Sequence, residues 1–380
     1  MFDTTEPDSI ELPAPPVSKP AQRLLDDFGG LHADSYRDYK TSLLSWLLRT
    51  GKAPERGKGY ATETVRVTHY KIEHAYRWKW ENTGEYTTDF TPDDADELIH
   101  VLFTRTDKSD NEIEKYQKAL KRLFAYKNHG EGHDYDWDPE PITTDYEGNA
   151  RHYFKKHEMN RLYQAALDYG SFISYTNKSL TPEDRERAAA HLAQRFGKPK
   201  SQIGPDDFDR ATSWKIPSLI AMTCDMGLRP DEVANARVGW LNTADREVTI
   251  PKEEASKDDA MWECTLSSQG ASALDRWLAE RQALSKYRET DALWLTREST
   301  HYRSKSLNHI LNKLIDMAGI EPRNRDLSWY SIRRGVATVW ANEEGIHNAK
   351  EQLRHKNIET TLKYVNTGLD VRREMADSKW

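Results

Sequence analysis

The chain has 380 residues, of which 37% are hydrophobic, and this length predicts two or three domains. It has no apolar run near the ~18 residues of a membrane span, no signal-peptide pattern and only two cysteines, so we expect a cytoplasmic, intracellular protein without a disulfide framework or a membrane partner. The net charge of −7 is unevenly spread: residues 128–150 carry −7 and residues 1–16 carry −4, which leaves the rest at +4. This distribution permits a polyanionic partner.

Acidic residues and prolines dominate residues 1–20, which predicts a disordered leader. Residues 21–128 have the apolar spacing of a compact helical domain. Within it we predict helices at 62–80 and 110–128, and a third that begins after Thr91, because threonine followed by proline is a strong helix start. Residues 129–150 are rich in Gly, Asp and Pro and have no periodicity, which predicts an acidic linker.

Two of these helices carry basic residues outside their apolar stripes. Such faces are either solvated surfaces or binding surfaces for a polyanion, and the charge pattern alone leaves both readings open. The basic residues concerned are Arg66, Lys71, Arg77, Lys115, Lys118, Lys121 and Arg122.

The second domain is predicted over residues 151–380. Helices are predicted at 157–169, 182–196, 206–226, 231–238, 269–286, 305–318, 332–344, 349–353 and 358–364. Two short strands, Glu247–Ile250 and Trp262–Leu266, are predicted to pair as a hairpin that lies between the helices at 231–238 and 269–286. The expected fold class is therefore mainly α, with a small β-hairpin or sheet in the second domain (α+β).

Residues suited to chemistry on a phosphodiester gather near the end of the chain. Tyr330, Arg333, His355 and Tyr364 follow one another at intervals of 3, 22 and 9, and Arg229 stands about a hundred residues upstream. Arginine forks bind phosphate oxygens, histidine moves protons near neutral pH, and a tyrosine oxygen can be a nucleophile. No metal-binding cluster accompanies them, so the arginines would supply the charge stabilisation. Each residue alone is most simply structural; their joint order favours catalysis.

Four segments carry a family resemblance: Gly227–Glu232, Tyr330–Arg334, Leu353–Lys356 and Tyr364. In order and spacing they resemble the catalytic boxes of the tyrosine recombinases, the phage integrase family, over residues 151–380. Residues 21–128 resemble, more weakly, the helical core-binding (SAM-like) domain of that family. The resemblance implies a two-domain clamp around DNA, with no cofactor and no metal.

The resemblance assigns roles to individual residues. Tyr364 would attack the scissile phosphate and form a 3′-phosphotyrosyl link, while Arg229 and Arg333 bind the non-bridging oxygens. His355 would assist proton movement at the phosphate. Glu232, one turn after the first arginine, is well placed to orient that guanidinium.

A lysine is expected to protonate the departing 5′-oxygen. Lys257, in the turn between the two strands, matches the family's lysine, and Lys252 is the competing candidate. Three positions depart from the commonest pattern: Tyr330 and Arg334 stand where histidine is frequent, and Arg354 stands where glycine often precedes the catalytic histidine. A phenol can still donate to a phosphate oxygen, and we expect Arg334 and Arg354 near the DNA backbone.

The function implied is that of a site-specific DNA recombinase or integrase of a virus or other mobile element. Its partners would be double-stranded DNA with paired inverted half-sites and further copies of the chain, assembled from dimer to tetramer on DNA. Two alternatives remain open from the sequence: a type I topoisomerase of the same chemistry and a non-catalytic DNA-binding regulator.

Overall fold

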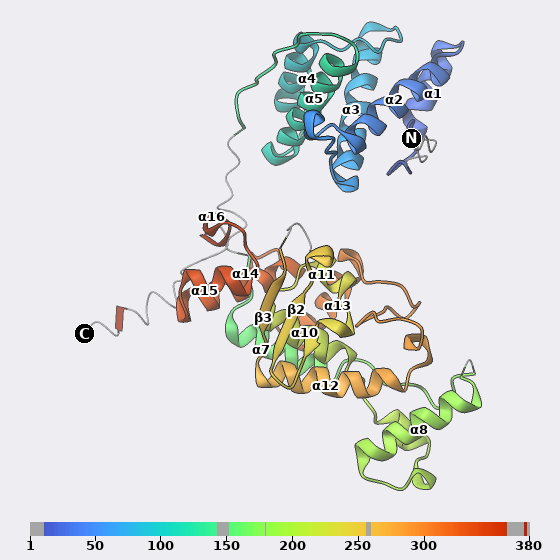
Figure 1. The fold of residues 1–380 in the computed structure, drawn as a ribbon, viewed down its shortest axis with the longest axis vertical. Helices are drawn as coiled ribbons and strands as arrows, with labels where there is room; N and C mark the ends of the chain where they lie inside the picture. The colour runs from blue at the N-terminus through green and yellow to red at the C-terminus, as the bar shows by residue number, and fades with distance from the viewer. Residues whose placement is uncertain (1–10, 143–151, 179, 256–259, 363–375, 378–380) are drawn as a thin grey trace, which may run out of the picture. The chain divides into compact units, whose positions relative to one another are not determined.

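The structure, a computed structural model, describes residues 11–142, 152–178, 180–255, 260–362 and 376–377. The chain divides into two compact units, residues 1–145 and 146–380, each with a hydrophobic core of its own (Figure 1). The predicted fold class is confirmed, since both units are mainly helical and the second adds a small antiparallel sheet. No helix among the described residues is long and apolar enough to cross a membrane.

The described part of the first unit is built from helices alone. They are α1 (Lys19–Phe28), α2 (His32–Arg49), the 3-10 turn η1 (Pro54–Arg56), α3 (Thr62–Thr83), α4 (Pro92–Arg105) and α5 (Asp110–Gly130). α5 packs against α2, α3 and α4. Thr91 caps α4 as predicted, in a reciprocal pair of hydrogen bonds with Asp94. In the described part of the predicted leader, Leu12 and Val17 pack against this core.

The acidic segment after α5 packs back onto the first unit over its described part, residues 131–142. The side chain of Asn128 exchanges two hydrogen bonds with the backbone of Tyr135, at 2.9 and 2.8 Å. The rings of Tyr135 and Trp137 meet Phe124 edge-on, with centroids 5.5 and 5.4 Å away. This half of the predicted linker is therefore attached to the helical unit by aromatic packing.

The second unit surrounds a short sheet with helices. Before the sheet come α7 (Lys156–Leu167), α8 (Pro182–Phe196), η2 (Lys200–Gln202), α9 (Pro205–Asp209), α10 (Lys215–Met226), α11 (Pro230–Asn235) and η3 (Val238–Trp240). The sheet has the order β1 (Leu241–Asn242), β2 (Glu247–Ile250) and β3 (Trp262–Thr265), with η4 (Lys252–Glu254) between the last two. After it come α12 (Ser268–Gln282), η5 (Ser285–Tyr287), α13 (Ser304–Met317), α14 (Trp329–Glu343), α15 (Ile346–Gln352) and α16 (Ile358–Leu362).

The central helix of the second unit is α10. It is apolar on nearly all sides, and it packs against α7, α12 and α14, as a helix without a polar face requires. Because α14 lies along α10, the first turns of α14 come beside the C-terminal end of α10. α15 in turn contacts α14 and β3. Three segments far apart in the sequence therefore converge at the end of one buried helix.

Two predicted elements differ in the structure. The single helix predicted over 206–226 is two helices, α9 and α10. Between them the backbone pairs with residues 170–172, through Phe172 N–H to Ala211 at 2.8 Å and Ser213 N–H to Gly170 at 3.1 Å. The sheet has a third strand, β1, which is only two residues long and too short to show the alternation of a strand.

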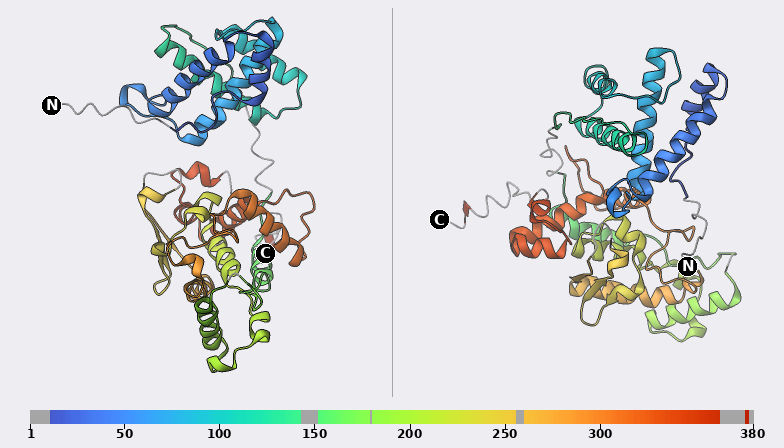
Figure 2. Two further views of the ribbon diagram at one scale, coloured as in Figure 1. Left: turned by 90° about the vertical axis from the view of Figure 1, so that its right-hand side faces the viewer. Right: turned by 45° about the horizontal axis from the view of Figure 1, so that its top comes forward.

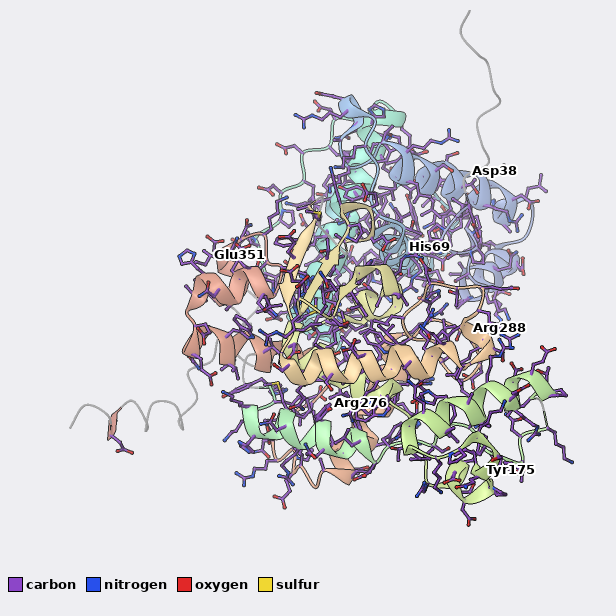
Figure 3. The ribbon with its side chains drawn as sticks, turned by 60° about the horizontal axis from the view of Figure 1, so that its bottom comes forward. Asp38, His69, Tyr175, Arg276, Arg288 and Glu351 are labelled. Atoms are coloured by element: carbon purple, nitrogen blue, oxygen red, sulfur yellow. The ribbon has the colours of Figure 1, made fainter. Side chains whose placement is uncertain are left out.

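A small satellite core joins α8 and α9 to α12. It comprises Phe172, Ala188, Leu192, Phe208, Ala211 and Ala283. Arg288, labelled in Figure 3, pairs with Asp184 of α8 in this satellite. Arg276 of α12, also labelled, stacks over the ring of Trp214, which packs against the main core, at 4.6 Å. α8 lies at the end of the second unit opposite α16 (Figures 1 and 2), so this satellite is separate from the convergence point at α10.

Candidate active site

The first segment of the site, Gly227–Glu232, follows the C-terminal end of α10. Gly227 ends that helix in the left-handed conformation, with φ +61°. A Cβ at this residue would lie 2.7 Å from Leu353 Cδ2 and 3.2 Å from Arg333 Cγ, so glycine is required both by the turn and by the packing. Pro230 then starts α11, and Arg229 occupies the position just before it with extended backbone. The chain thus delivers Arg229 to the point where α14 and α15 converge.

A buried carboxylate, Glu232, organises the arginines. It accepts hydrogen bonds from the backbone N–H and the Nη1 of Arg229, both at 2.7 Å, as the sequence led us to expect. It also accepts from Nη2 and Nε of Arg354, at 2.7 and 3.2 Å. Arg333 Nη1 lies 4.0 Å from the same carboxylate. Burial alone would raise the pKa of Glu232, but the charges of Arg354, Arg333 and Arg229 outweigh it and lower the pKa to about 2.

Arg333 connects the first box to the last. Its side chain is 1% exposed and donates from Nη1 to the Gly227 carbonyl at 2.6 Å and from Nη2 to the Leu353 carbonyl. These carbonyls stand at the ends of α10 and α15, where helix geometry leaves backbone acceptors available. One guanidinium therefore fixes the relative positions of the two boxes.

His355 lies in the segment Leu353–Lys356, two residues after Leu353, and is 2% exposed. Its Nδ1 lies 2.9 Å from the hydroxyl of Thr361, a buried residue of α16. Burial, together with the positive charges of Arg333, Arg229 and Arg354, lowers the pKa of His355 to about 3. The imidazole is therefore neutral at physiological pH in the absence of DNA, and a bound phosphate would oppose the three arginine charges.

The remaining residues predicted for the site divide into three groups. Tyr330 lies half-buried in the first turn of α14, and Arg334, half-buried on the same helix, donates to the His152 carbonyl at 3.3 Å. Arg354 is 1% exposed and points into the site, which removes it from the candidates for contact with the DNA backbone. Lys257 and Tyr364 lie outside the described residues. The competing Lys252 is exposed at the start of η4.

Six of the seven basic residues predicted on the helices of the first unit contact acidic or polar partners. Lys71 pairs with Glu112 and lies over the Tyr116 ring at 4.4 Å. The further contacts are Arg66–Glu63, Lys115–Glu112, Lys118–Glu114, Lys121–Asp138 and Arg122 with the Thr68 hydroxyl. Arg77 is half-buried, with its Nε enclosed. Lys118 and Lys121 keep side chains about half exposed, at 55% and 47%, and present the most accessible charge on α5.

Two features of the site were not predicted from the sequence. Thr361 is one of many threonines and carries no motif, so only the fold shows that its hydroxyl meets His355. The inward direction of Arg354 was also missed. A positive φ of +57° at this residue turns the side chain toward Glu232 instead of toward solvent. The sequence did hold one signal for this conformation, because the family that the chain resembles often has glycine at this position.

Known proteins resemble this chain in sequence over part of its length and in fold. Residues 207–368 match the model of the Phage integrase family, and no curated protein matches the sequence. A XerH site-specific recombinase bound to palindromic difH substrate, in a post-cleavage complex, is similar over 93% of this chain and 88% of that chain, with a TM-score of 0.57 and 15% identity. A Tn1549 transposon integrase in complex with transposon right end DNA is similar over 88% and 98%, with a TM-score of 0.51 and 13% identity.

At such identities the structural similarity shows a shared fold, while the family match rests on sequence. The matched range includes Arg229, Glu232, Arg333 and His355, the residues that converge at the end of α10. Over residues 207–368, this chain is similar in sequence to the phage integrase family, the tyrosine recombinases.

Proposed function

We propose that this protein is a site-specific DNA recombinase that cuts and rejoins duplex DNA through a covalent 3′-phosphotyrosyl intermediate. The observation that carries the proposal is the convergence of Arg229, Arg333 and His355 around one buried carboxylate, Glu232. Two guanidiniums on fixed backbone form a preorganised receptor for a phosphodiester, because their charge and donors need no rearrangement when negative charge builds up on the phosphorus centre.

The chemistry exchanges one phosphoester bond for another. The Tyr364 oxygen attacks the phosphorus and forms the new P–O bond, the bond to the 5′-oxygen breaks, and the phenolic proton passes to the neutral imidazole of His355. Lys257 gives a proton to the departing 5′-oxygen, which becomes a hydroxyl. The reverse reaction, with a 5′-hydroxyl of a second strand, rejoins the DNA. Bond energy is conserved in the phosphotyrosyl ester, so no co-reactant enters either step.

His355 suits the role of a proton carrier beside the phosphate. Its neutral ring, held at Nδ1 by Thr361, can accept or donate at its other nitrogen when the substrate's negative charge offsets the nearby arginines. Tyr330, from the same helix as Arg333, would donate its hydroxyl proton in a hydrogen bond to the phosphate.

Both units would bind DNA, with the units closing as a clamp. Lys118 and Lys121, which are more exposed than Lys115 on the same helix α5, are the cations that would meet phosphates, and phosphate neutralisation makes such binding depend steeply on salt. Recombination between two duplexes needs paired half-sites and four protomers, so a dimer on each site would pair into a tetramer. The solved structures similar in fold include a transposon integrase on transposon-end DNA, which supports a role in a mobile element.

The proposal is tested by covalent capture. A library of duplexes with a randomised centre of about 30 base pairs, each carrying a nick, is incubated with the protein; cleavage next to a nick releases a short fragment and traps the adduct. Captured DNA is sequenced, and the enriched sequence defines what we term the selected duplex. An enriched sequence with inverted repeats is expected. Adducts without sequence preference, together with relaxation of any supercoiled plasmid, would favour a topoisomerase, and binding without adducts would favour a regulator.

A further inference from the structure

Arg354 is the site residue whose placement the reaction scheme leaves unexplained. It occupies a left-handed backbone conformation, φ +57°, that an L-residue with a side chain adopts at an energetic disadvantage. Such strain persists only where surrounding contacts hold it. Here the whole guanidinium is enclosed, with Nη1 donating to the carbonyls of Met226 and Gln352, both at 3.0 Å, and lying 3.5 Å from Cys264 Sγ.

The other side of the guanidinium forms a fork with Glu232, through Nη2 at 2.7 Å and Nε at 3.2 Å. Glu232 is the same carboxylate that accepts from Arg229 and lies 4.0 Å from Arg333. Without the charge of Arg354, the Glu232 carboxylate would offset one of the two positive charges, those of Arg229 and Arg333, that would attract the phosphate. In a buried site such an offset acts more strongly than it would in water, because the surrounding dielectric constant is lower.

We propose that Arg354 is a positioning residue for DNA cleavage: it balances the charge of Glu232, so that Glu232 can orient Arg229 without weakening the attraction of Arg229 and Arg333 for the scissile phosphate. The Nη1 of the same guanidinium also donates to the Met226 carbonyl, which ties the residue before His355 to the end of α10. The inference rests on the proposed function and adds to it a role for a residue that does not itself touch the substrate.

The test uses the selected duplex in its nicked form and measures the single-turnover rate of adduct formation at saturating protein. Arg354→Met removes the charge and the fork while keeping an unbranched side chain, and it is expected to slow adduct formation on the order of 10²-fold, as displacement of a reacting group does. DNA affinity is expected to stay within about 3-fold, since phosphate contacts elsewhere dominate binding. Arg354→Lys keeps the charge and should recover part of the rate.

A substrate with a neutral methylphosphonate at the scissile position separates charge balance from folding. With one negative charge removed from the substrate, the difference between wild type and Arg354→Met should shrink to about 5-fold or less. An equal loss on both substrates would overturn the inference, because a structural defect does not sense the charge of the phosphate.

Two further variants keep the test decisive. In the double variant Glu232→Gln/Arg354→Met both buried charges are gone, so it should fold, and it should cleave faster than Arg354→Met alone. A double variant slower than Arg354→Met would contradict charge balance. Arg325→Met is the matched control: it breaks another two-point ion pair, with Glu158 at 2.8 and 2.7 Å, and should keep the wild-type rate.

The outcomes separate the inference from the proposed function. If wild type forms no adduct, the proposed function fails. If wild type forms adducts and Arg354→Met forms them at the same rate, only the role of Arg354 fails.

Discussion

The guanidinium of Arg333 donates a hydrogen bond to the carbonyl oxygen of Gly227 across 2.6 Å, and these two residues are separated by 106 positions in the sequence. The same side chain donates to the Leu353 carbonyl, so a single arginine fastens the ends of α10 and α15 together. Its role is therefore double: it supplies charge for a phosphate, and it holds the backbone that presents Arg229 and His355. Substitution of Gly227, whose carbonyl accepts this hydrogen bond, tests whether the contact holds the backbone in place.

Gly227→Ala is expected to lower both stability and the rate of adduct formation. The added methyl group meets Leu353 Cδ2 at 2.7 Å, and the φ of +61° is strained for alanine, which together cost about 1–3 kcal/mol. The measurements are thermal unfolding and single-turnover capture of the selected duplex. Gly239→Ala is the control, since its Cβ would meet nothing within 4 Å. Equal behaviour of the two variants would contradict the packing described for Gly227.

Thr361→Val is expected to slow adduct formation by about 10-fold with little change in stability, because it removes the hydroxyl that holds His355 Nδ1 and keeps the shape of the side chain. Thr361→Ser, which restores the hydroxyl, should recover the rate. A valine variant as fast as wild type would mean that this hydrogen bond does not orient the imidazole during cleavage.

Much of this site could be predicted from the sequence because its residues fall into short boxes. Arg229 and Glu232 are one helical turn apart, and their hydrogen bond follows from that spacing. Arg333 and His355 were identified by their intervals and do lie in one site with Arg229. The fold class was likewise accessible, since long amphipathic helices dominate both units.

Other features depend on tertiary contacts that a linear pattern does not contain. Arg354 was expected at the DNA backbone, because an arginine in a basic segment is usually solvent-exposed. Its direction is set instead by a left-handed backbone and a buried carboxylate contributed by α11. The break between α9 and α10 was missed for a similar reason: residues 211–213 pair with residues 170–172, a contact that overrides local helical spacing.

Glu280 is expected to make stability depend on pH. It is fully buried, accepts from the Ser213 hydroxyl at 2.5 Å and from the Trp214 N–H at 2.7 Å, and burial raises its pKa to about 7. The folded protein then keeps a proton that the unfolded chain releases near pH 4.5, so stability falls as pH rises between these values, by about 3 kcal/mol in total.

Glu280→Gln does not ionise and should lack this decline. Urea unfolding of both proteins at pH 5 and pH 8 measures it, because contributions from other groups, such as Asp225, cancel in the comparison. If the free energies of unfolding of wild type and variant differ by the same amount at both pH values, a raised pKa at Glu280 is contradicted.

Lys121→Ala is expected to reduce the salt dependence of DNA binding. If Lys121 neutralises one phosphate, the slope of log K against log salt concentration should fall in magnitude by about 0.9. Asp138→Asn is the paired variant, because it removes the carboxylate that binds Lys121 at 2.6 Å and should leave the slope undiminished. Titrations of the selected duplex from low to moderate salt provide the slopes. An unchanged slope for Lys121→Ala would remove this residue from the DNA interface.

In the proposed reaction, a covalent bond forms between Tyr364 and DNA. The most direct measurement is peptide mapping of the SDS-stable adduct formed on the nicked selected duplex, with Tyr364→Phe as the matched variant that lacks only the phenolic oxygen. We expect a nucleotide attached to the peptide that contains Tyr364, and no adduct with the phenylalanine variant. An adduct that persists in Tyr364→Phe, or a nucleotide attached to another residue, would contradict it.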